Sequence, residues 1–317
     1  MNKKNVLVLI AIGLLIIPIA NVAAVETYHV FFPSINCPPA RKGVGGSMTT
    51  SDMAVIGTMW YHHWSLCTET EPDTCVDVSK GFWTWQDPPD GYGQGPDEID
   101  AALLQCRSGW FMFGDEWEYQ NWLQPGYYPI SKQIEEARWY IQRRASVNPD
   151  CKLAFGGILT FHPMCRGGSC EYRKIAVDWL SDFYNAYVVE YGEAPDVDAI
   201  VFDDYYWASH YYGLGYPWQY WDDVTREAVQ TARDLYGSDI EIWAREIGSL
   251  RKDPGDHDRY PLEALEQLDE IVSFYDRYAW FISKANSGSP WYYCAIWVDG
   301  ELTPVGEAYA EFERGDW

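Results

Sequence analysis

The stretch Gly109-Trp-Phe-Met-Phe-Gly114, followed at once by Asp115-Glu116, decides the fold of this chain. Four apolar residues between two glycines are typical of a strand that is buried on both faces, as in a parallel sheet. The next apolar run of strand length is 152–159, and between the two runs the segment 130–147 has the apolar spacing of a helix. A strand, a helix and a strand in this order predict two parallel neighbours joined by a right-handed crossover.

This alternation extends over most of the chain. Strands are expected at 53–60, 76–85, 109–114, 152–159, 197–202, 240–246, 277–282 and 291–298, and helices at 96–105, 130–147, 173–191, 221–236 and 261–274. About seven such units without an internal repeat favour a single-domain α/β fold, the (β/α)8 TIM barrel. The alternative is an open doubly wound sheet, which usually carries a Gly-rich phosphate turn after its first strand. Gly43-Val-Gly-Gly46 follows no expected strand, so the barrel is preferred.

The first 24 residues have the pattern of a secretory signal peptide. Lys3 and Lys4 are followed by an uncharged apolar run, which ends in small residues up to Ala24. An uncleaved N-terminal anchor is the alternative, although the apolar run is shorter than the roughly 20 residues that span a bilayer. We therefore expect a signal peptide at 1–24, an N-terminal extension at 25–52 and the barrel domain at 53–317, in a secreted, extracellular protein.

Acidic residues outnumber basic ones by 47 to 23, which gives a formal net charge of −24. So acidic a surface repels the phosphate backbone of nucleic acids and anionic lipid headgroups. We therefore expect no nucleic-acid partner and no membrane contact beyond the signal segment, and we expect a monomer. Aromatic residues make up 17% of the chain. Most belong to the core, and those at strand ends or in loops are candidates for stacking on sugar rings: Trp60, Trp64, Trp83, Trp85, Trp117 and Trp280.

The eight cysteines of an exported chain predict four disulfides. Two local pairs close short loops, and two further pairs follow by elimination: Cys67 with Cys75, Cys165 with Cys170, then Cys106 with Cys151 and Cys37 with Cys294. The sequence shows neither a C-x-x-C spacing nor a cluster of Cys and His, so no metal site and no cofactor are expected.

Carboxylates and aromatic side chains stand just past the expected strands, where the active site of a (β/α)8 barrel lies. They are Trp60, Tyr61, His62, His63, Trp64, Asp115, Glu116, Asp203, Asp204, Tyr205, Arg245, Glu246 and Trp280. A pair of carboxyl groups with flat aromatic rings is typical of a sugar-cleaving site, because one carboxyl protonates the leaving oxygen and the other attacks or activates water. Glu116 and Glu246 are the predicted catalytic pair. The residues predicted to bind substrate are Trp60, Tyr61, His63, Trp64, Asp115, Asp204, Tyr205 and Trp280.

Each of these residues also has a structural interpretation. Glu116 could be an ordinary loop carboxylate, and Glu246 could form an ion pair with Arg245. Asp203-Asp204 could bind calcium, tune an acid or support its neighbours by hydrogen bonding. His62-His63 could bind substrate hydroxyls or be structural.

Several motifs resemble those of the clan A glycoside hydrolases. Asp115-Glu116 is similar to the Asn-Glu that follows the fourth strand in that clan, and Trp243-Ala-Arg-Glu246-Ile-Gly248 is similar to the W-x-T-E-x-G of the seventh strand. The nearest resemblance is to glycoside hydrolase family 128, the endo-β-1,3-glucanases. It rests on three further segments: Trp60-Tyr-His-His-Trp64 beside the family's W-Y-Y-N-W, Arg277-Tyr-Ala-Trp-Phe281 beside R-Y-A-W-F, and Gly300 to Tyr309 beside G-x-L-T-x-x-G-x-x-Y. The resemblance runs from Val55 to Tyr309 and implies Glu116 as acid/base and Glu246 as nucleophile.

Four departures from the family pattern bear on activity. Asp115 stands where the family has Asn, Arg245 where it has Thr, and His63 where it has Asn, while Asp203-Asp204-Tyr205 replaces H-x-Y. An Asp cannot donate a hydrogen bond as an amide does, and beside Glu116 it would raise the pKa of that acid. Altered specificity and lost activity both fit these changes.

The sequence therefore predicts a secreted retaining glycoside hydrolase that acts on a polysaccharide, and the resemblance implies a β-1,3-glucan. Its two catalytic carboxyl groups should lie roughly 5–5.5 Å apart. The alternatives are a catalytically degenerate glycan-binding or cell-surface protein on the same barrel, and a disulfide-stapled structural exoprotein without a ligand.

Overall fold

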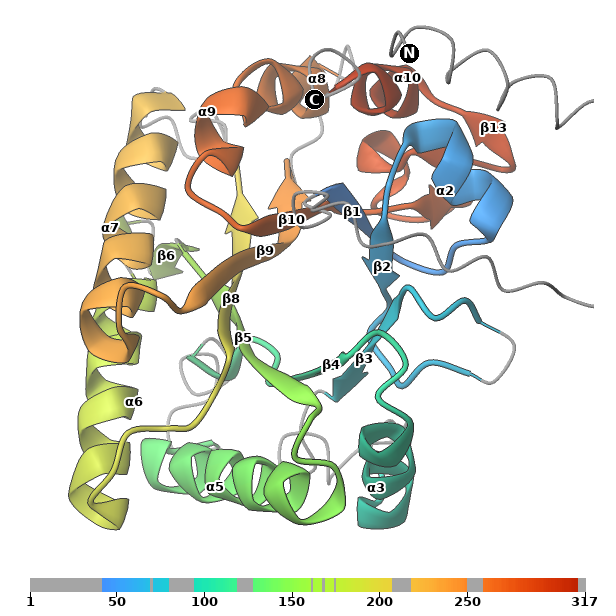
Figure 1. Cartoon of the computed structure of the whole chain (residues 1–317). Helices are drawn as coiled ribbons and strands as arrows, with labels where there is room; N and C mark the ends of the chain where they lie inside the picture. The colour runs from blue at the N-terminus through green and yellow to red at the C-terminus, as the bar shows by residue number, and fades with distance from the viewer. Residues whose placement is uncertain are drawn as a thin grey trace, which may run out of the picture. The chain divides into compact units, whose positions relative to one another are not determined.

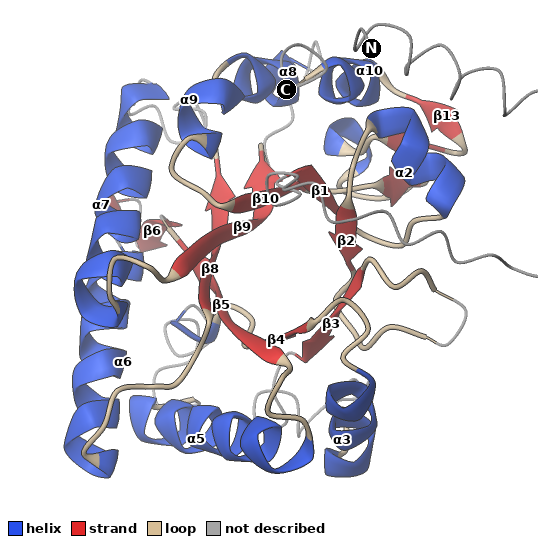
Figure 2. Cartoon of the chain, viewed as in Figure 1, coloured by secondary structure: helices blue, strands red, loops and turns tan. Residues whose placement is uncertain are grey.

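Eight parallel strands close into a barrel in the computed structural model, which describes residues 42–68, 71–79, 94–118, 128–160, 162–166, 169–173, 175–206, 218–249 and 259–312. Figure 2 shows them as a closed ring, in the order β1, β10, β9, β8, β5, β4, β3, β2. Their bounds are β1 Lys42–Gly45, β2 Trp60–His62, β3 Cys75–Ser79, β4 Trp110–Phe113, β5 Lys152–Leu159, β8 Ala199–Tyr205, β9 Glu241–Gly248 and β10 Arg277–Trp280. The predicted (β/α)8 fold is confirmed.

Helices surround this ring (Figure 1). They are α2 Thr50–Ile56, α3 Pro96–Gln105, α5 Ile130–Val147, α6 Ile175–Tyr191, α7 Trp218–Tyr236, α8 Arg259–Glu266, α9 Leu268–Val272 and α10 Pro304–Glu311. The bounds of α3 and α5 are the predicted ones, because a proline in the first turn and an Asn-Pro pair after the last turn mark their ends in the sequence. The helix expected at 261–274 is divided into α8 and α9 at Gln267.

Smaller elements are added to the barrel. A hairpin, β6 His162–Arg166 and β7 Ser169–Arg173, is inserted between β5 and α6. A three-stranded sheet follows β10 and consists of β11 Lys284–Ala285, β12 Trp297–Val298 and β13 Glu301–Leu302. The strand expected at 291–298 is instead a 3-10 turn, Tyr292–Cys294, followed by β12.

The barrel begins earlier than the predicted residue 53. Its first strand, β1, lies inside the segment expected as an extension, and it is hard to recognise because it holds two glycines and Lys42. The Lys42 ammonium is buried and donates to the carbonyls of Tyr309 and Phe312 at 2.6 and 2.7 Å. The strand expected at 53–60 is wrong: residues 50–56 form α2, because Thr49 and Asp52 make a capping box and Gly57 ends the helix in a left-handed conformation.

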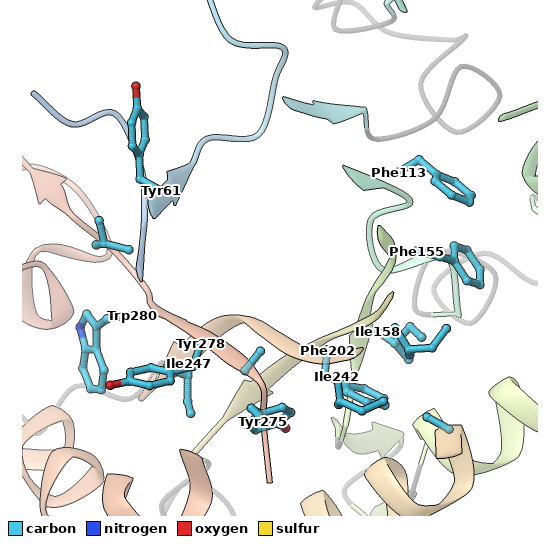
Figure 3. Close-up of a cluster of buried hydrophobic side chains, with 14 of the residues drawn as sticks. Tyr61, Phe113, Phe155, Ile158, Phe202, Ile242, Ile247, Tyr275, Tyr278 and Trp280 are labelled. Atoms are coloured by element: carbon cyan, nitrogen blue, oxygen red, sulfur yellow. The ribbon is translucent and has the colours of Figure 1, made fainter. Parts of the chain in front are cut away.

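Strand residues alternate between two packed layers. One layer fills the barrel and includes Trp60, Trp110 and Trp243, whose rings lie 4.5 Å (Trp110 to Trp243) and 5.7 Å (Trp60 to Trp243) apart. Gly43 makes room for Trp60, since a Cβ there would lie 2.3 Å from the indole. The other layer points away from the barrel axis toward the helices, as Figure 3 shows for Phe155, Phe202 and others. This alternation decides which side chains reach the site.

Two of the four predicted disulfides are confirmed, Cys67–Cys75 and Cys106–Cys151. Cys165 and Cys170 are directly paired partners in the β6–β7 hairpin. Cys294 is buried and forms no disulfide with a cysteine of the described residues, and its predicted partner Cys37 lies outside them. The expected signal peptide at 1–24 also lies outside the described residues. Among the helices that the structure describes, none has the length and hydropathy needed to cross a membrane.

Candidate active site

Glu116 is held by an unusual turn at the end of β4. Gly114 and Glu116 both have positive φ angles, 95° and 49°. Gly114 packs so closely on β5 that a Cβ there would lie 2.8 Å from the Gly156 carbonyl oxygen, and the Glu116 amide donates to the Gly157 carbonyl at 2.9 Å. A left-handed glutamate is strained, and such strain concentrates at functional sites. The side chain of Glu116 is half-buried.

Glu246 lies on β9, where the strand contains a β-bulge. Phe202 on β8 pairs with Ala244, but the next residue, Asp203, pairs with Glu246, so β9 has one extra residue at Arg245. The pairing of β9 with β10 shifts in the same place. Regular alternation would send Glu246 outward together with Ile242 and Ala244, which lie in the layer under the helices. Because of the bulge, Arg245 and Glu246 both reach the barrel interior.

The Glu246 carboxylate accepts two hydrogen bonds from the site. Trp64 Nε1 donates to Oε1 at 2.5 Å, and the Tyr205 hydroxyl donates to Oε2. Arg245 Nη2 lies 3.5 Å from Oε1. Each oxygen of Glu246 is thus held by a hydrogen-bond donor, and Oε1 also lies near a cation.

Arg245 is the centre of a buried charge network. Its guanidinium pairs with both oxygens of Asp203, with Nε 3.0 Å from Oδ1, and Nη2 lies 2.8 Å from Asp115 Oδ1. Gly157 provides the space, since a Cβ there would lie 2.5 Å from Arg245 Nη2. The Arg245 carbonyl accepts a hydrogen bond from His62 Nε2 at 2.9 Å. Burial, and then the nearby Arg245 charge, lower the pKa of His62 to about 3, so this imidazole is neutral.

Glu116 has the opposite surroundings to Glu246. Burial raises its pKa well above the ordinary value, and the charges of Asp115, Asp203 and Glu246 raise it further. Glu118, two residues on, is also buried, which raises its pKa to about 8, and its Oε1 accepts from the Leu159 amide at 2.7 Å. Glu116 is therefore a carboxyl group that keeps its proton at pH values where most carboxyls have lost theirs.

An aromatic wall, formed by Trp64, Tyr205 and Phe281, stands beside Glu246. The Phe281 ring meets Trp64 and Tyr205 edge-on, at centroid distances of 5.7 and 5.8 Å. Phe281 follows β10 directly and belongs to the same small cluster as Tyr205 and Leu159. The sequence interpretation missed Phe281 because it chose the preceding Trp280. Strand alternation was the signal that could have identified it, since Ala279 faces the barrel interior and Phe281 lies two residues further.

The structure brings five of the predicted residues together: Glu116, Glu246, Asp115, Trp64 and Tyr205. Three others lie in the two core layers. Trp60 begins β2 and fills the bottom of the barrel, whereas Tyr61 and Trp280 point outward under the helices (Figure 3). Trp280 Nε1 donates to the Cys294 carbonyl at 2.9 Å. These three are not placed to touch a substrate.

Asp204 also lies outside the site. Its neighbour Asp203 faces the barrel interior, where the sequence predicts Asp204. Asp204 points outward and accepts four hydrogen bonds, from Thr160, Trp221, Thr225 and Tyr275. Asp203 points inward to Arg245. The two carboxylates therefore do not converge on a calcium ion, and Asp204 joins β8 to the helices around it.

His63 faces a disulfide loop instead of a substrate. Its Nδ1 bonds Ser65 Oγ at 2.6 Å, and its Nε2 lies 2.9 Å from Glu71 Oε1. The structure thus assembles a Cys/His cluster that the spacing did not indicate: the ligand atoms of His63, Cys67, Glu71 and Cys75 lie within 4.8 Å of one another. The two sulfurs are joined to each other. Two of the four donors of a metal site are therefore already used, and His63 Nε2 is hydrogen-bonded to the Glu71 carboxylate.

No protein-family model and no curated protein matches the chain. Solved structures do match its fold. One is a GH128 (subgroup II) endo-beta-1,3-glucanase from Sorangium cellulosum, with 18% identity, a TM-score of 0.55, and coverage of 86% of this chain and 98% of that one. A monomeric beta-xylosidase from Caulobacter crescentus matches with 11% identity, a TM-score of 0.57 and coverage of 85% and 67%. The GH39 enzyme from Xanthomonas axonopodis pv. citri matches with 10% identity, a TM-score of 0.56 and coverage of 85% and 65%. At these identities the likeness shows a shared fold, and it agrees with the resemblance seen in the motifs.

Proposed function

We propose that this protein is a retaining glycoside hydrolase that cleaves a polysaccharide, with Glu116 as acid/base and Glu246 as nucleophile. One observation carries the proposal. Two carboxyl groups at the ends of β4 and β9 have opposite surroundings, one among other carboxylates and one among donors. The raised pKa of Glu116 suits a proton donor, and the hydrogen bonds that orient the Glu246 carboxylate suit a nucleophile.

In the first step, a carboxylate oxygen of Glu246 attacks the anomeric carbon while Glu116 gives its proton to the departing glycosidic oxygen. The C–O bond to the leaving sugar breaks, and an ester between the sugar and Glu246 forms. In the second step, the ionised Glu116 takes a proton from water, whose oxygen attacks the same carbon and releases Glu246. Both groups return to their initial protonation states.

Residues around the pair hold this arrangement. The hydrogen bonds from Trp64 and Tyr205 orient the Glu246 carboxylate, and Arg245 balances part of the negative charge contributed by Asp115 and Asp203. Asp115 is paired with Arg245 through Oδ1, and as a carboxylate it can accept a hydrogen bond from a sugar hydroxyl but cannot donate one. The aromatic wall of Trp64, Tyr205 and Phe281 offers apolar surface to the sugar ring.

The finer properties are part of the same proposal. A β-1,3-glucan as substrate is supported by the motif resemblance and by the fold shared with an endo-beta-1,3-glucanase. Export is supported by the signal-like pattern at 1–24 and by the disulfides. We also propose a monomer that does not bind nucleic acid, in keeping with the net charge of −24.

The test is release of reducing ends from a panel of β-glucans and other polysaccharides. Glu246→Gln should abolish release, and a 2-deoxy-2-fluoro glycoside should label Glu246 covalently. Glu116→Gln should keep activity on substrates with a good leaving group, and added azide should restore part of its rate. Release that persists in Glu246→Gln, or a label on another residue, would overturn the assignment.

A second candidate function is a glycan-binding protein without turnover. It is favoured by the ion pair between Arg245 and Asp115, two positions that depart from the family pattern. In that case the same panel would show binding without released reducing ends, and binding would be unchanged in Glu246→Gln.

A further inference from the structure

Trp291 is an exposed aromatic side chain next to the site that the proposed mechanism does not use. Its relative exposure is 37%, and among the large hydrophobic side chains that the structure finds exposed, it is the aromatic one. Its ring meets the ring of Phe281 edge-on, with a centroid distance of 6.0 Å. Single exposed apolar residues are common on protein surfaces. Trp291 differs from such residues because its ring contacts the aromatic wall beside Glu246.

A continuous series of rings leads from the nucleophile to Trp291. Glu246 accepts from Trp64 and Tyr205, both of these rings contact Phe281, and Phe281 contacts Trp291. Tyr205 and Phe281 are nearly buried, at 4% and 8% exposed, Trp64 is partly exposed, and Trp291 at the end of the series is 37% exposed. The series of rings thus reaches from the proposed nucleophile to solvent.

The segment that carries Trp291 is held in place by its own backbone. The Trp291 amide donates to Ser289 Oγ at 3.2 Å, and the Ser289 amide donates to the Asn286 carbonyl at 2.9 Å. After Trp291 the chain forms a 3-10 turn, whose Cys294 amide donates to the Trp291 carbonyl at 3.2 Å. A backbone that is already ordered around Trp291 loses little conformational freedom when a ligand stacks on the ring, which favours binding.

We propose that Trp291 is a stacking platform for a second sugar of the substrate chain, next to the sugar whose bond is cleaved. This inference rests on the proposed function. The occupant is the neighbouring pyranose of the same polysaccharide, because the aromatic surface is continuous with the catalytic wall. The apolar C–H face of a pyranose packs on an indole, and the stacked sugar keeps its hydroxyls in water. The enzyme should therefore act on oligosaccharides better than on single glycosides.

The experiment compares Trp291→Ala with wild type on two kinds of substrate. These are an aryl β-glucoside with one sugar, and β-1,3-linked gluco-oligosaccharides of two to six units. Loss of the ring should lower kcat/KM on the longer oligosaccharides by about tenfold and leave the aryl glucoside within about twofold. Trp291→Phe, which keeps an aromatic face, should recover much of the loss. Leu104→Ala, at an exposed apolar side chain on α3, is the matched control and should change neither substrate.

Other outcomes overturn the inference. If Trp291→Ala affects both substrates equally, or neither, Trp291 is not a subsite. If wild type cleaves none of these compounds, the proposed function fails for this substrate class, and calorimetric titration with the hexasaccharide then decides about Trp291. Binding that weakens in Trp291→Ala but not in Leu104→Ala supports the platform, whereas equal binding or none refutes it.

Discussion

Replacement of Arg245 by methionine should lower the free energy of unfolding far more than replacement of a surface arginine. The Arg245 side chain is 1% exposed, and its partners Asp203 and Asp115 are 0% and 12% exposed. Removal of one partner of a buried ion pair typically costs about 3–5 kcal/mol, because the remaining charge has no counter-charge. We expect Arg245→Met to lower the free energy of unfolding at pH 7 by about this amount.

The loss should depend on pH with a definite sign. Burial already raises the pKa of Asp203 well above its ordinary value with the guanidinium beside it. Removal of that positive charge raises the pKa of Asp203 further, so the folded variant binds more protons than the unfolded chain. The destabilisation is therefore largest above the raised pKa of the folded state. It becomes smaller as the pH falls toward the pKa of the same carboxyl group in the unfolded chain. The variant should therefore lie closer to wild type at pH 5 than at pH 7.

Urea denaturation, followed by tryptophan fluorescence at both pH values, measures this difference. Arg245→Met/Asp203→Asn should recover part of the loss, because it removes one of the unpaired charges. Arg226→Met is the matched control: Arg226 also pairs with an aspartate, but its side chain is 59% exposed, so its loss should hardly change the midpoint. If Arg245→Met unfolds at the same urea concentration as Arg226→Met, or if its deficit does not shrink at pH 5, the buried network does not stabilise the fold.

Two further predictions concern the acid and the cross-links. In the proposed mechanism the raised pKa of Glu116 sets the basic limb of kcat/KM, so Asp115→Asn should move that limb to lower pH by removing a like charge. A pH–rate profile with an unmoved limb would contradict this. Opening Cys106–Cys151, with a sequence separation of 45, should cost about 4 kcal/mol by loop entropy, against about 2.5 kcal/mol for the disulfide with a separation of 8. Calorimetry of the two double Cys→Ala variants should show this order, and the reverse order would exclude a loop-entropy origin.

The sequence was sufficient for the fold, and it pointed to Glu116 and Glu246, which the structure brings into one site. Buried strands and amphipathic helices have distinct periods, and a carboxylate directly after a buried strand marks the active end of a barrel. β1 could not be recognised because Gly43 and Gly45 carry no pattern, and their role is to admit the large rings of neighbouring strands. The helix α2 was mistaken for a strand because a short apolar run suits both, and only its caps distinguish them.

Strand alternation explains where the structure differs from the predicted site. The sequence predicts Asp204 and Trp280 at the site, whereas the structure turns their neighbours Asp203 and Phe281 toward it, a difference of one residue in each case. Glu246 lies at the site, although on a regular strand it would point outward. Its inward position depends on the extra residue in β9, and a one-residue bulge leaves no trace in the pattern of apolar residues.

The tryptophans at the bottom of the barrel restrict how a substrate can approach. Trp60, Trp110 and Trp243 pack together and fill the amino-terminal end of the barrel. Because these side chains occupy the axis, no passage runs through the barrel. Water, substrate and product must all use the opposite opening. Under the proposed function, a long glycan is therefore not threaded through the molecule. It lies across the opening, with one linkage near Glu116 and Glu246 and the rest of the chain on the rim.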